Sequence, residues 1–277
     1  MIRGNRCSLW LVRFRTGERR APAAGGGKVP VALRPAIGVA RETMPFSPGG
    51  IFGSERNAME AAVAAFFDVD YTVLSVSSGR QWVRYLRRNG RITWRLWGMF
   101  LWLALRYYLG LLEFPRASAK LTAMIAGADE QAFREETRRW FEEWVRPYIA
   151  PGAVERIVWH RAQGHQIALV SAATEYVVRP LAETLGIPDY LCTRLEVVDG
   201  RLTGRVVEPP CYGPGKVYWV ERYAAERGID LARSYFYSDS YTDRYLLLRV
   251  GYPIAVNPDP RLRRLARQRG WPIERFY

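Results

Sequence analysis

The feature that most constrains the fold is an apolar run, Ala61 to Phe67, which ends abruptly at two aspartates one residue apart, Asp68 and Asp70. The run is long enough for a buried strand, so the two carboxylates are expected in the loop that follows it. In open α/β sheets, ligands bind beyond the carboxyl ends of the strands. Alone, the pattern has a second interpretation, an acidic turn whose side chains bond to the local backbone.

Three further polar stretches follow apolar or glycine-rich segments later in the chain. Ser171 follows an apolar run, Lys216 follows Gly213-Pro214-Gly215, and the pair Asp239 and Asp243 follows an aromatic run. An acidic pair, a hydroxyl, a lysine and a second acidic pair therefore occur in this order.

This order of motifs makes the chain from Met59 to the C-terminus resemble the haloacid dehalogenase-like (HAD) phosphohydrolases, in particular the subfamily that includes phosphoserine phosphatase. The resemblance implies an α/β fold, with a Rossmann-like parallel sheet and an all-helical cap inserted after the first strand. It also implies an enzyme, a phosphatase acting on phosphoric monoesters.

The net charge of +14 on 277 residues raises the question of a nucleic-acid partner. Residues 1–58 hold ten basic and three acidic residues, a net of +7 and thus half of the total. In the rest of the chain the arginines are mostly interleaved with acids, as on ordinary solvated helix faces, and no nucleic-acid-binding motif accompanies them. We therefore expect no nucleic-acid partner.

Few residues are available for a zinc site or a histidine-dependent triad. The histidines and cysteines of the chain are His160, His165, Cys7, Cys192 and Cys211. Any metal is therefore expected to be held by oxygen, and the sparse cysteines indicate a reducing compartment rather than a disulfide framework. We expect a cytoplasmic protein in which Cys192 and Cys211 are core or loop residues.

Composition and periodicity divide the chain into three parts. Residues 1–58 lack sustained periodicity and contain glycine- and proline-rich stretches, so we expect a disordered leader. Residues 59–76 and 147–277 are expected to form the Rossmann-like catalytic core. Residues 77–146 are helical in character and are expected to form the cap. Its helices are predicted to end at Asn89-Gly90, to cover Thr93–Leu112 and Ser118–Ile125, and to run from an N-cap at Asp129 to about Val145.

The cap segment Thr93–Leu112 is rich in aromatic residues. Arg95 and Arg106 lie inside it, and a charge near the centre of a membrane helix costs about 2.5–3.5 kcal/mol on insertion scales. A membrane span is therefore the least favoured of three interpretations. The others are an interfacial helix in peripheral contact with a membrane and a buried or substrate-facing cap helix, which is favoured.

From Pro151 onward, helical and strand patterns alternate. Strands are expected at His165–Val170, Ser234–Tyr237 and Tyr252–Val256, and Asp199-Gly200 predicts a hairpin turn between two further strands. Helices are expected around Val154–Arg161, Val177–Leu185, Lys216–Arg227 and Leu246–Leu248, and after Pro260. Repeated αβ units predict a parallel sheet covered on both faces.

The resemblance assigns the reacting groups residue by residue. Asp68 matches the nucleophile that forms a phospho-aspartyl intermediate, and Asp70 matches the general acid and base. Lys216 would lie beside both the nucleophile and a phosphoryl oxygen. Ser171 is expected at a strand end as a phosphate ligand, with a helix N-cap as the alternative. Thr72 is grouped with the phosphate-binding residues, and its hydroxyl is expected to order the loop rather than to react.

Mg²⁺ is the cofactor that the resemblance implies, because a carboxylate and a phosphate repel each other without positive charge between them. Its expected ligands are Asp68, the backbone carbonyl of Asp70, and Asp239. Asp243, four residues beyond Asp239, would orient the site from one helical turn away. The alternative role for Asp239 is a helix cap.

Three positions depart from the subfamily pattern. Ser238 stands where glycine is usual, and Ser-Ala-Ala-Thr from Ser171 replaces a Ser-Gly-Gly sequence, but neither change removes a reacting group. Ser77 stands nine residues after the nucleophile, where phosphoserine phosphatases have a glutamate that binds the substrate amine. Phosphoserine is therefore disfavoured as the substrate.

The sequence thus predicts a Mg²⁺-dependent phosphomonoester hydrolase whose substrate is a phosphorylated small molecule or lipid. The aromatic residues of the cap favour a substrate with an apolar moiety, although packing among cap helices accounts for them slightly better. These residues are Trp94, Trp97, Trp102, Tyr107 and Tyr108. The alternatives are a phosphoserine phosphatase-like enzyme for small metabolites, a phosphotransferase, and a non-catalytic membrane-associated binding protein with the same fold.

Overall fold

Six parallel strands form the central sheet of the computed structural model, which describes residues 61–91, 98, 102 and 121–277. Their order is β3-β2-β1-β6-β7-β8, so β1 (Ala64–Phe67) lies in the interior of the sheet between two parallel neighbours. The other strands are β2 (Gln166–Thr174), β3 (Asp189–Thr193), β6 (Tyr235–Ser238), β7 (Tyr252–Val256) and β8 (Ile273–Glu274).

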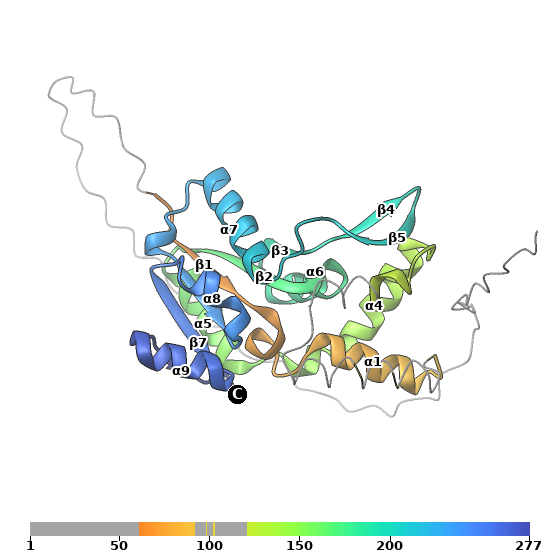
Figure 1. The fold of residues 1–277 in the computed structure, drawn as a ribbon, viewed down its shortest axis with the longest axis horizontal. Coiled ribbons are helices and arrows are strands. Elements are labelled where there is room, and N and C mark those ends of the chain that lie inside the picture. The colour runs from red at the N-terminus through yellow and green to blue at the C-terminus, as the bar shows by residue number, and fades with distance from the viewer. Residues whose placement is uncertain (1–60, 92–97, 99–101, 103–120) are drawn as a thin grey trace, which may run out of the picture. The chain divides into compact units, whose positions relative to one another are not determined.

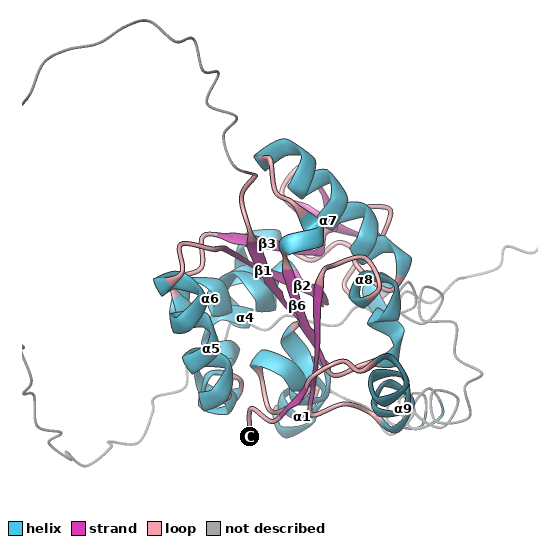
Figure 2. Cartoon of the chain, turned by 90° about the vertical axis from the view of Figure 1, so that its left-hand side faces the viewer, coloured by secondary structure: helices cyan, strands magenta, loops and turns pink. Residues whose placement is uncertain are grey.

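Helices cover both faces of this sheet, because successive residues of a buried strand point to opposite sides. From β1, Ala65 and Phe67 enter one apolar core, while Ala64 and Phe66 enter the other. The first core is completed by α4 (Glu130–Trp144), α5 (Pro151–Ala162) and α6 (Glu175–Leu185), and the second by α7 (Pro214–Arg227), α8 (Arg244–Leu247) and α9 (Pro260–Arg269). Figure 2 shows the sheet between these two groups of helices.

The predicted α/β fold with a parallel sheet is therefore confirmed. Helix α1 (Ser78–Arg88) has Asn89 as its C-cap, and Gly90 follows with a φ of +66°, as the Asn-Gly pair predicts. Helix α4 begins at the predicted N-cap, where the Asp129 side chain accepts a hydrogen bond from the Ala132 amide at 2.9 Å. Strands β3 and β8 were not predicted, because neither five residues of mixed polarity nor two residues after a helix carry a clear periodic signal.

The aromatic cap segment Thr93–Leu112 falls outside the described residues, except for Gly98 and Trp102, and Ser118–Ile125 is described only from Leu121. Both helix predictions, and the three interpretations of the aromatic segment, therefore remain predictions. In the part of the chain that the structure describes, no helix is long and apolar enough to cross a membrane.

A separate antiparallel hairpin, β4 (Leu195–Val198) and β5 (Arg201–Val206), connects the sheet to α4 (Figure 1). Asp199 and Gly200 have φ values of +49° and +72°, which confirms the predicted two-residue turn. The Gly127 amide donates to the Leu202 carbonyl at 2.7 Å, and the Leu202 amide donates to the Ala128 carbonyl at 2.9 Å. Backbone hydrogen bonds thus join the hairpin to the segment that leads into α4.

Residues 1–60 lie outside the described residues, so the division at residue 58 stays a prediction. Deleting residues 1–58 is expected to change the melting temperature by less than about 2 °C, because no predicted element of the core is removed. Calorimetry of the shortened and full-length proteins measures this change. As a control, a deletion through residue 67 also removes β1 and should abolish folding. A large loss of stability on the shorter deletion would show that the leader packs on the core.

Both histidines of the chain meet at the side of the sheet covered by α5. His160 is fully buried, its Nδ1 lies 2.8 Å from Nδ1 of His165, and its Nε2 lies 2.8 Å from the Tyr237 hydroxyl. Two facing ring nitrogens share one proton, so the two rings cannot both be cationic. Burial, followed by the charges of His165 and Arg156, lowers the pKa of His160 to about 3.

This depressed pKa predicts an acid sensitivity of the fold. Below about pH 6.5 the unfolded chain binds a proton at His160 that the folded chain excludes, so stability is lost as the pH falls. From this residue the free energy of unfolding should decrease by about 1.4 kcal/mol per pH unit between pH 6 and pH 4. Denaturant unfolding at several pH values measures the slope. His160→Phe should make the slope shallower by that amount, and identical slopes in both proteins would contradict the assignment.

Candidate active site

The candidate nucleophile follows directly on β1. The Asp68 amide donates to the Tyr237 carbonyl at 2.9 Å, which continues the pairing of β1 with β6 by one residue. The chain then folds into a tight turn over Val69–Val73 that is closed by a 2.8 Å bond from the Leu74 amide to the Val69 carbonyl. Asp68 therefore lies at the carboxyl end of an interior strand, where the residue is 7% exposed.

Lys216 joins the first and last motifs. Its side chain is almost completely buried, and its Nζ lies 2.6 Å from Oδ1 of Asp68 and 2.6 Å from Oδ2 of Asp243. Burial by itself lowers the pKa of Lys216, but the Asp243 and Asp68 carboxylates outweigh this effect and hold the pKa above its ordinary value. Lys216 is therefore a permanent cation between two carboxylates.

The segment before Lys216 explains how a lysine is delivered to this buried position. Gly213 has a φ of +52°, and α7 begins immediately afterwards at Pro214. A Cβ atom at Gly215 would lie 1.9 Å from the Pro210 carbonyl oxygen, so only glycine fits there. This close approach places Lys216 in the first turn of α7.

The second acidic pair is divided between two tasks. Asp243 is buried, and its Oδ2 accepts hydrogen bonds from Lys216 and, at 2.7 Å, from the Ser238 hydroxyl. The Asp239 side chain makes no hydrogen bond or ion pair with the described residues. The cap alternative for Asp239 is wrong, because Ser240 is the N-cap of the next turn and accepts from the Thr242 amide. Asp239 thus remains available as a ligand.

Carboxylates outnumber cations in this site. Asp68, Asp70, Asp239 and Asp243 lie close enough to influence one another, and Lys216 is the cation they share. Burial, with Asp243 and Asp70 adding to it and Lys216 opposing it, raises the pKa of Asp68; burial followed by the charge of Asp68 raises the pKa of Asp239.

This excess of negative charge fits a divalent cation, which would favour the ionised form of each acid. Among the described residues, no three His, Cys, Asp or Glu side chains form a ligand cluster. Mg²⁺ does not need such a cluster, because it is bound by one or two carboxylates together with water and substrate phosphate. The donor set therefore fits Mg²⁺ better than zinc.

The Asp70 side chain contacts the first residue of α1. Its Oδ1 accepts a hydrogen bond from the Ser78 amide at 3.1 Å, at the beginning of α1. Burial raises the pKa of Asp70, and the hydrogen bond from Ser78 opposes this rise. The acidic-turn interpretation therefore holds in part for Asp70, whereas Asp68 bonds to Lys216. Ser77 is the N-cap of α1 and accepts from the Arg80 amide.

The structure corrects two expectations about hydroxyl groups. Strand β2 continues to Thr174, so Ser171 lies within the strand, at a shift in register with β3, rather than at its end. Its hydroxyl is buried and accepts from the Ala173 amide at 3.1 Å, while Thr174 is the N-cap of α6, so the N-cap alternative for Ser171 is wrong. The Thr72 hydroxyl is buried and has no hydrogen-bond partner among the described residues, so backbone bonds and not Thr72 order the loop.

Two positioning contacts were not anticipated from the sequence. Ser238 departs from the glycine that is usual at this position, and its hydroxyl donates a hydrogen bond to Asp243. The Ser78 amide orients Asp70 across eight residues. The contact of Ser238 with Asp243 could have been suspected from their close spacing in the sequence. The contact of Ser78 with Asp70 depends on where α1 begins.

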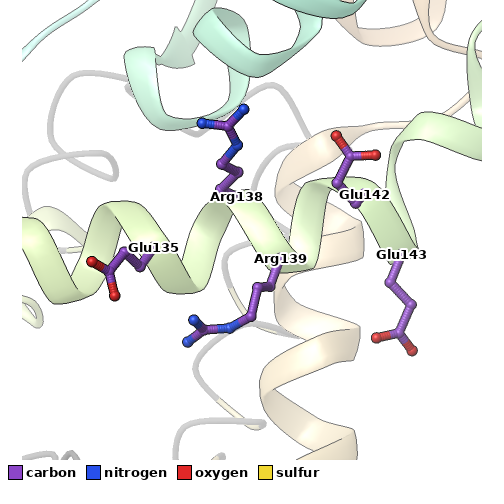
Figure 3. Close-up of a pocket in the computed structure, with 5 residues that line it drawn as sticks. All are labelled: Glu135, Arg138, Arg139, Glu142 and Glu143. Atoms are coloured by element: carbon purple, nitrogen blue, oxygen red, sulfur yellow. The ribbon is translucent and has the colours of Figure 1, made fainter.

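A pocket on the surface of α4 lies apart from these residues (Figure 3). Its lining consists of Glu135, Arg138, Arg139, Glu142 and Glu143. Arg138 forms an exposed ion pair with Glu183 of α6, at 3.5 Å, and Glu142 pairs with Arg146 at 2.7 Å. Acidic and basic side chains are mixed here and form exposed ion pairs, as on an ordinary solvated helix face.

Comparison with known proteins places this arrangement in context. The family model described as haloacid dehalogenase-like hydrolase matches residues 65–248, a range that holds every candidate site residue. The chain is 35% identical over 238 residues to a phosphoserine phosphatase of Mycobacterium tuberculosis (strain ATCC 25618 / H37Rv), covering 83% of this chain and 76% of that protein.

Two further proteins are similar over most of their length. A histidinol-phosphatase of Neisseria meningitidis serogroup C (strain 8013) is 31% identical over 217 residues, which cover 76% of this chain and 98% of that protein. The crystal structure of a protein of unknown function from Bordetella pertussis Tohama I is similar with a TM-score of 0.70 and 35% identity, covering 78% of this chain and all of that one.

Proposed function

This chain belongs to the haloacid dehalogenase-like hydrolases and is a phosphatase of that family; from this premise, we propose that it hydrolyses a phosphomonoester in two steps through a phosphorylated Asp68. The observation that carries the proposal is the contact of the Lys216 ammonium with Asp68 and Asp243. The ammonium contacts Oδ1 of Asp68, and Oδ2 of the same carboxylate lies outside this contact.

In the first step, an oxygen of Asp68 attacks phosphorus, an acyl phosphate forms, and the bond from phosphorus to the leaving oxygen breaks. Asp70 gives its proton to that oxygen, so the product leaves as an alcohol. The raised pKa of Asp70 supports this role, because the carboxyl must be protonated when the ester bond breaks.

In the second step, Asp70 is a carboxylate and removes a proton from water. The water oxygen attacks phosphorus and the bond from phosphorus to the Asp68 oxygen breaks, which releases phosphate and restores the Asp68 carboxylate. The Lys216 ammonium and the Ser171 hydroxyl are proposed to hold phosphoryl oxygens in both steps. The buried hydroxyl of Thr72 has no hydrogen-bond partner in the described part of the chain, and we propose that it also binds the substrate phosphate.

Mg²⁺ is the proposed cofactor, with Asp68, the Asp70 carbonyl and Asp239 as its protein ligands. When bound, it neutralises charge between the phosphate and the carboxylates. Asp239 has no other bonding partner among the described residues, and Asp243 is fixed by Ser238 and Lys216 as a support rather than a ligand.

The proposed reaction predicts an absolute requirement for Mg²⁺. Hydrolysis of p-nitrophenyl phosphate by the purified protein should fall to background in EDTA and return when MgCl₂ is added in excess. One mole of phosphate should be released for each mole of alcohol, which separates hydrolysis from transfer to another acceptor. A protein that binds phosphomonoesters without any turnover would support the non-catalytic alternative instead.

The proposed substrate is a phosphorylated small molecule, in keeping with the phosphatases of M. tuberculosis and N. meningitidis that this chain resembles. Ser77 caps α1 and supplies no carboxylate for a substrate amine. Phosphoserine therefore remains a disfavoured substrate in this proposal. The predicted apolar moiety rests on residues 94–108, nearly all of which lie outside the described residues.

A panel of monoesters decides between these substrate classes. If the apolar prediction is right, kcat/KM for a lysophospholipid-type monoester should exceed that for phosphoserine, histidinol phosphate and small sugar phosphates, and Trp97→Ala should reduce the difference. A preference for the small polar esters that Trp97→Ala leaves unchanged would exclude an apolar substrate.

A further inference from the structure

Tyr71 has an unusual backbone conformation in the loop that carries both reacting aspartates. Its φ of +56° and ψ of +8° place it in the left-handed region, directly after Asp70. This region is readily open to glycine and disfavoured for residues with a large side chain. Other contacts must therefore hold Tyr71 in this conformation.

Both backbone polar groups of Tyr71 are engaged. Its amide donates to the Val76 carbonyl at 3.3 Å, within the same loop. Its carbonyl accepts from the hydroxyl of Tyr277 at 3.2 Å, across 206 residues of sequence. Tyr277 thus supplies a hydrogen bond to the loop from a distant part of the chain.

The residues before Tyr277 are fixed in place. Strand β8 extends the sheet, and Phe276 is 5% exposed, with its ring 5.9 Å from that of Tyr237. The Gly152 amide donates to the Phe276 carbonyl at 3.1 Å, and a Cβ at Gly152 would lie 2.7 Å from the Phe276 Cα. In Figures 1 and 2 the C-terminus lies beside the loop that precedes α1. Tyr277 is therefore presented to this loop by an anchored segment.

We propose that Tyr277 is a positioning residue for the phosphatase reaction. It holds Tyr71 in the left-handed conformation and so keeps Asp68 and Asp70 directed at the same phosphoryl group. The inference rests on the proposed roles of these two aspartates. It adds a residue outside the four motifs, and outside the range that the family model matches.

The test begins with Tyr277→Phe, which keeps the ring and removes only the donor. We expect kcat to fall about three- to tenfold, the range that one lost hydrogen bond gives, while KM stays within about twofold. The melting temperature should not change, since Phe276 still anchors the segment. Tyr252→Phe is the matched control. Tyr252 is 50% exposed, and the loss of its hydroxyl should leave kcat unchanged.

A second substitution separates positioning from a general structural effect. Glycine adopts a positive φ freely, so in a Tyr71→Gly background the loop no longer needs the Tyr277 hydroxyl. Adding Tyr277→Phe to that background should then change kcat by less than about 1.5-fold. An equal loss of kcat in both backgrounds would overturn the proposal.

Amide hydrogen exchange tests the same contact without any turnover. Tyr277→Phe should accelerate exchange in a peptide covering residues 69–76 and leave a peptide from β2 unchanged. Unchanged exchange in both peptides would also overturn the proposal. If the wild-type protein hydrolyses no ester but its loop responds in this way, the proposed function fails while the positioning contact stands.

Discussion

Asp68→Asn is expected to lower kcat by about four orders of magnitude or more while leaving the protein folded. The amide has nearly the same volume as the carboxylate but lacks the anion that attacks phosphorus. The ammonium of Lys216 keeps its contact with Asp243, so the buried charge is still paired. Steady-state assays with Mg²⁺ and thermal unfolding of the same samples measure the two effects.

The matched control for this substitution is Asp199→Asn at the hairpin turn. Asparagine adopts the positive φ of that turn readily, so activity and stability should both persist. Acid quenching during turnover of a ³²P-labelled ester should trap label on the wild-type protein and none on Asp68→Asn. Near-normal turnover by Asp68→Asn, or label retained by it, would show that another residue is the nucleophile.

Lys216→Met is expected to abolish activity and also to destabilise the fold by about 3–5 kcal/mol in the absence of Mg²⁺. Methionine replaces much of the volume of lysine, but it leaves the buried carboxylates of Asp68 and Asp243 without their cation. Removing one partner of a buried ionic group costs more than the group itself contributes, because the remaining charges stay desolvated. Denaturant unfolding measures the loss.

Arg222→Met is the control on the same helix. Its ion pair with Glu226 is 60% exposed on both sides, and such exposed pairs contribute little to stability because water and salt screen them. Added Mg²⁺ should recover part of the stability lost in Lys216→Met, because a divalent cation compensates the same carboxylates. Equal, small losses for both substitutions would mean that the buried ionic group is neutralised in another way.

Much of the fold was accessible from the sequence, because its signals are local. The alternation of apolar runs with glycine- and proline-containing turns predicted the strands on either side of β1. The Asn89-Gly90 pair predicted the end of a helix, and the Asp199-Gly200 pair predicted a hairpin turn. The candidate site could be assembled because parallel strands deliver their following residues to one edge of the sheet.

What the sequence could not supply are contacts between distant segments. The pairing of Leu202 with the residues before α4 depends on backbone groups that every residue has. Ser171 was expected at a strand end because the apolar run stops there, but backbone pairing with β3 carries β2 three residues further. The bond from Tyr277 to Tyr71 depends on the path of the last seven residues, which carry no periodic pattern.

The close approach of Gly215 to Pro210 also bears on how the protein tolerates mutation. Any other residue at position 215 must push α7 away from the segment before it, and Lys216 moves with that helix. A random-mutagenesis screen for lost phosphatase activity should therefore recover substitutions at Gly215 as readily as substitutions at Lys216, although Gly215 has no reactive group. Ranking positions by intolerance alone would count this glycine as part of the chemistry. The yield of soluble protein separates Gly215 from the nucleophile, because a change at Gly215 disturbs packing, whereas Asp68→Asn leaves the protein folded.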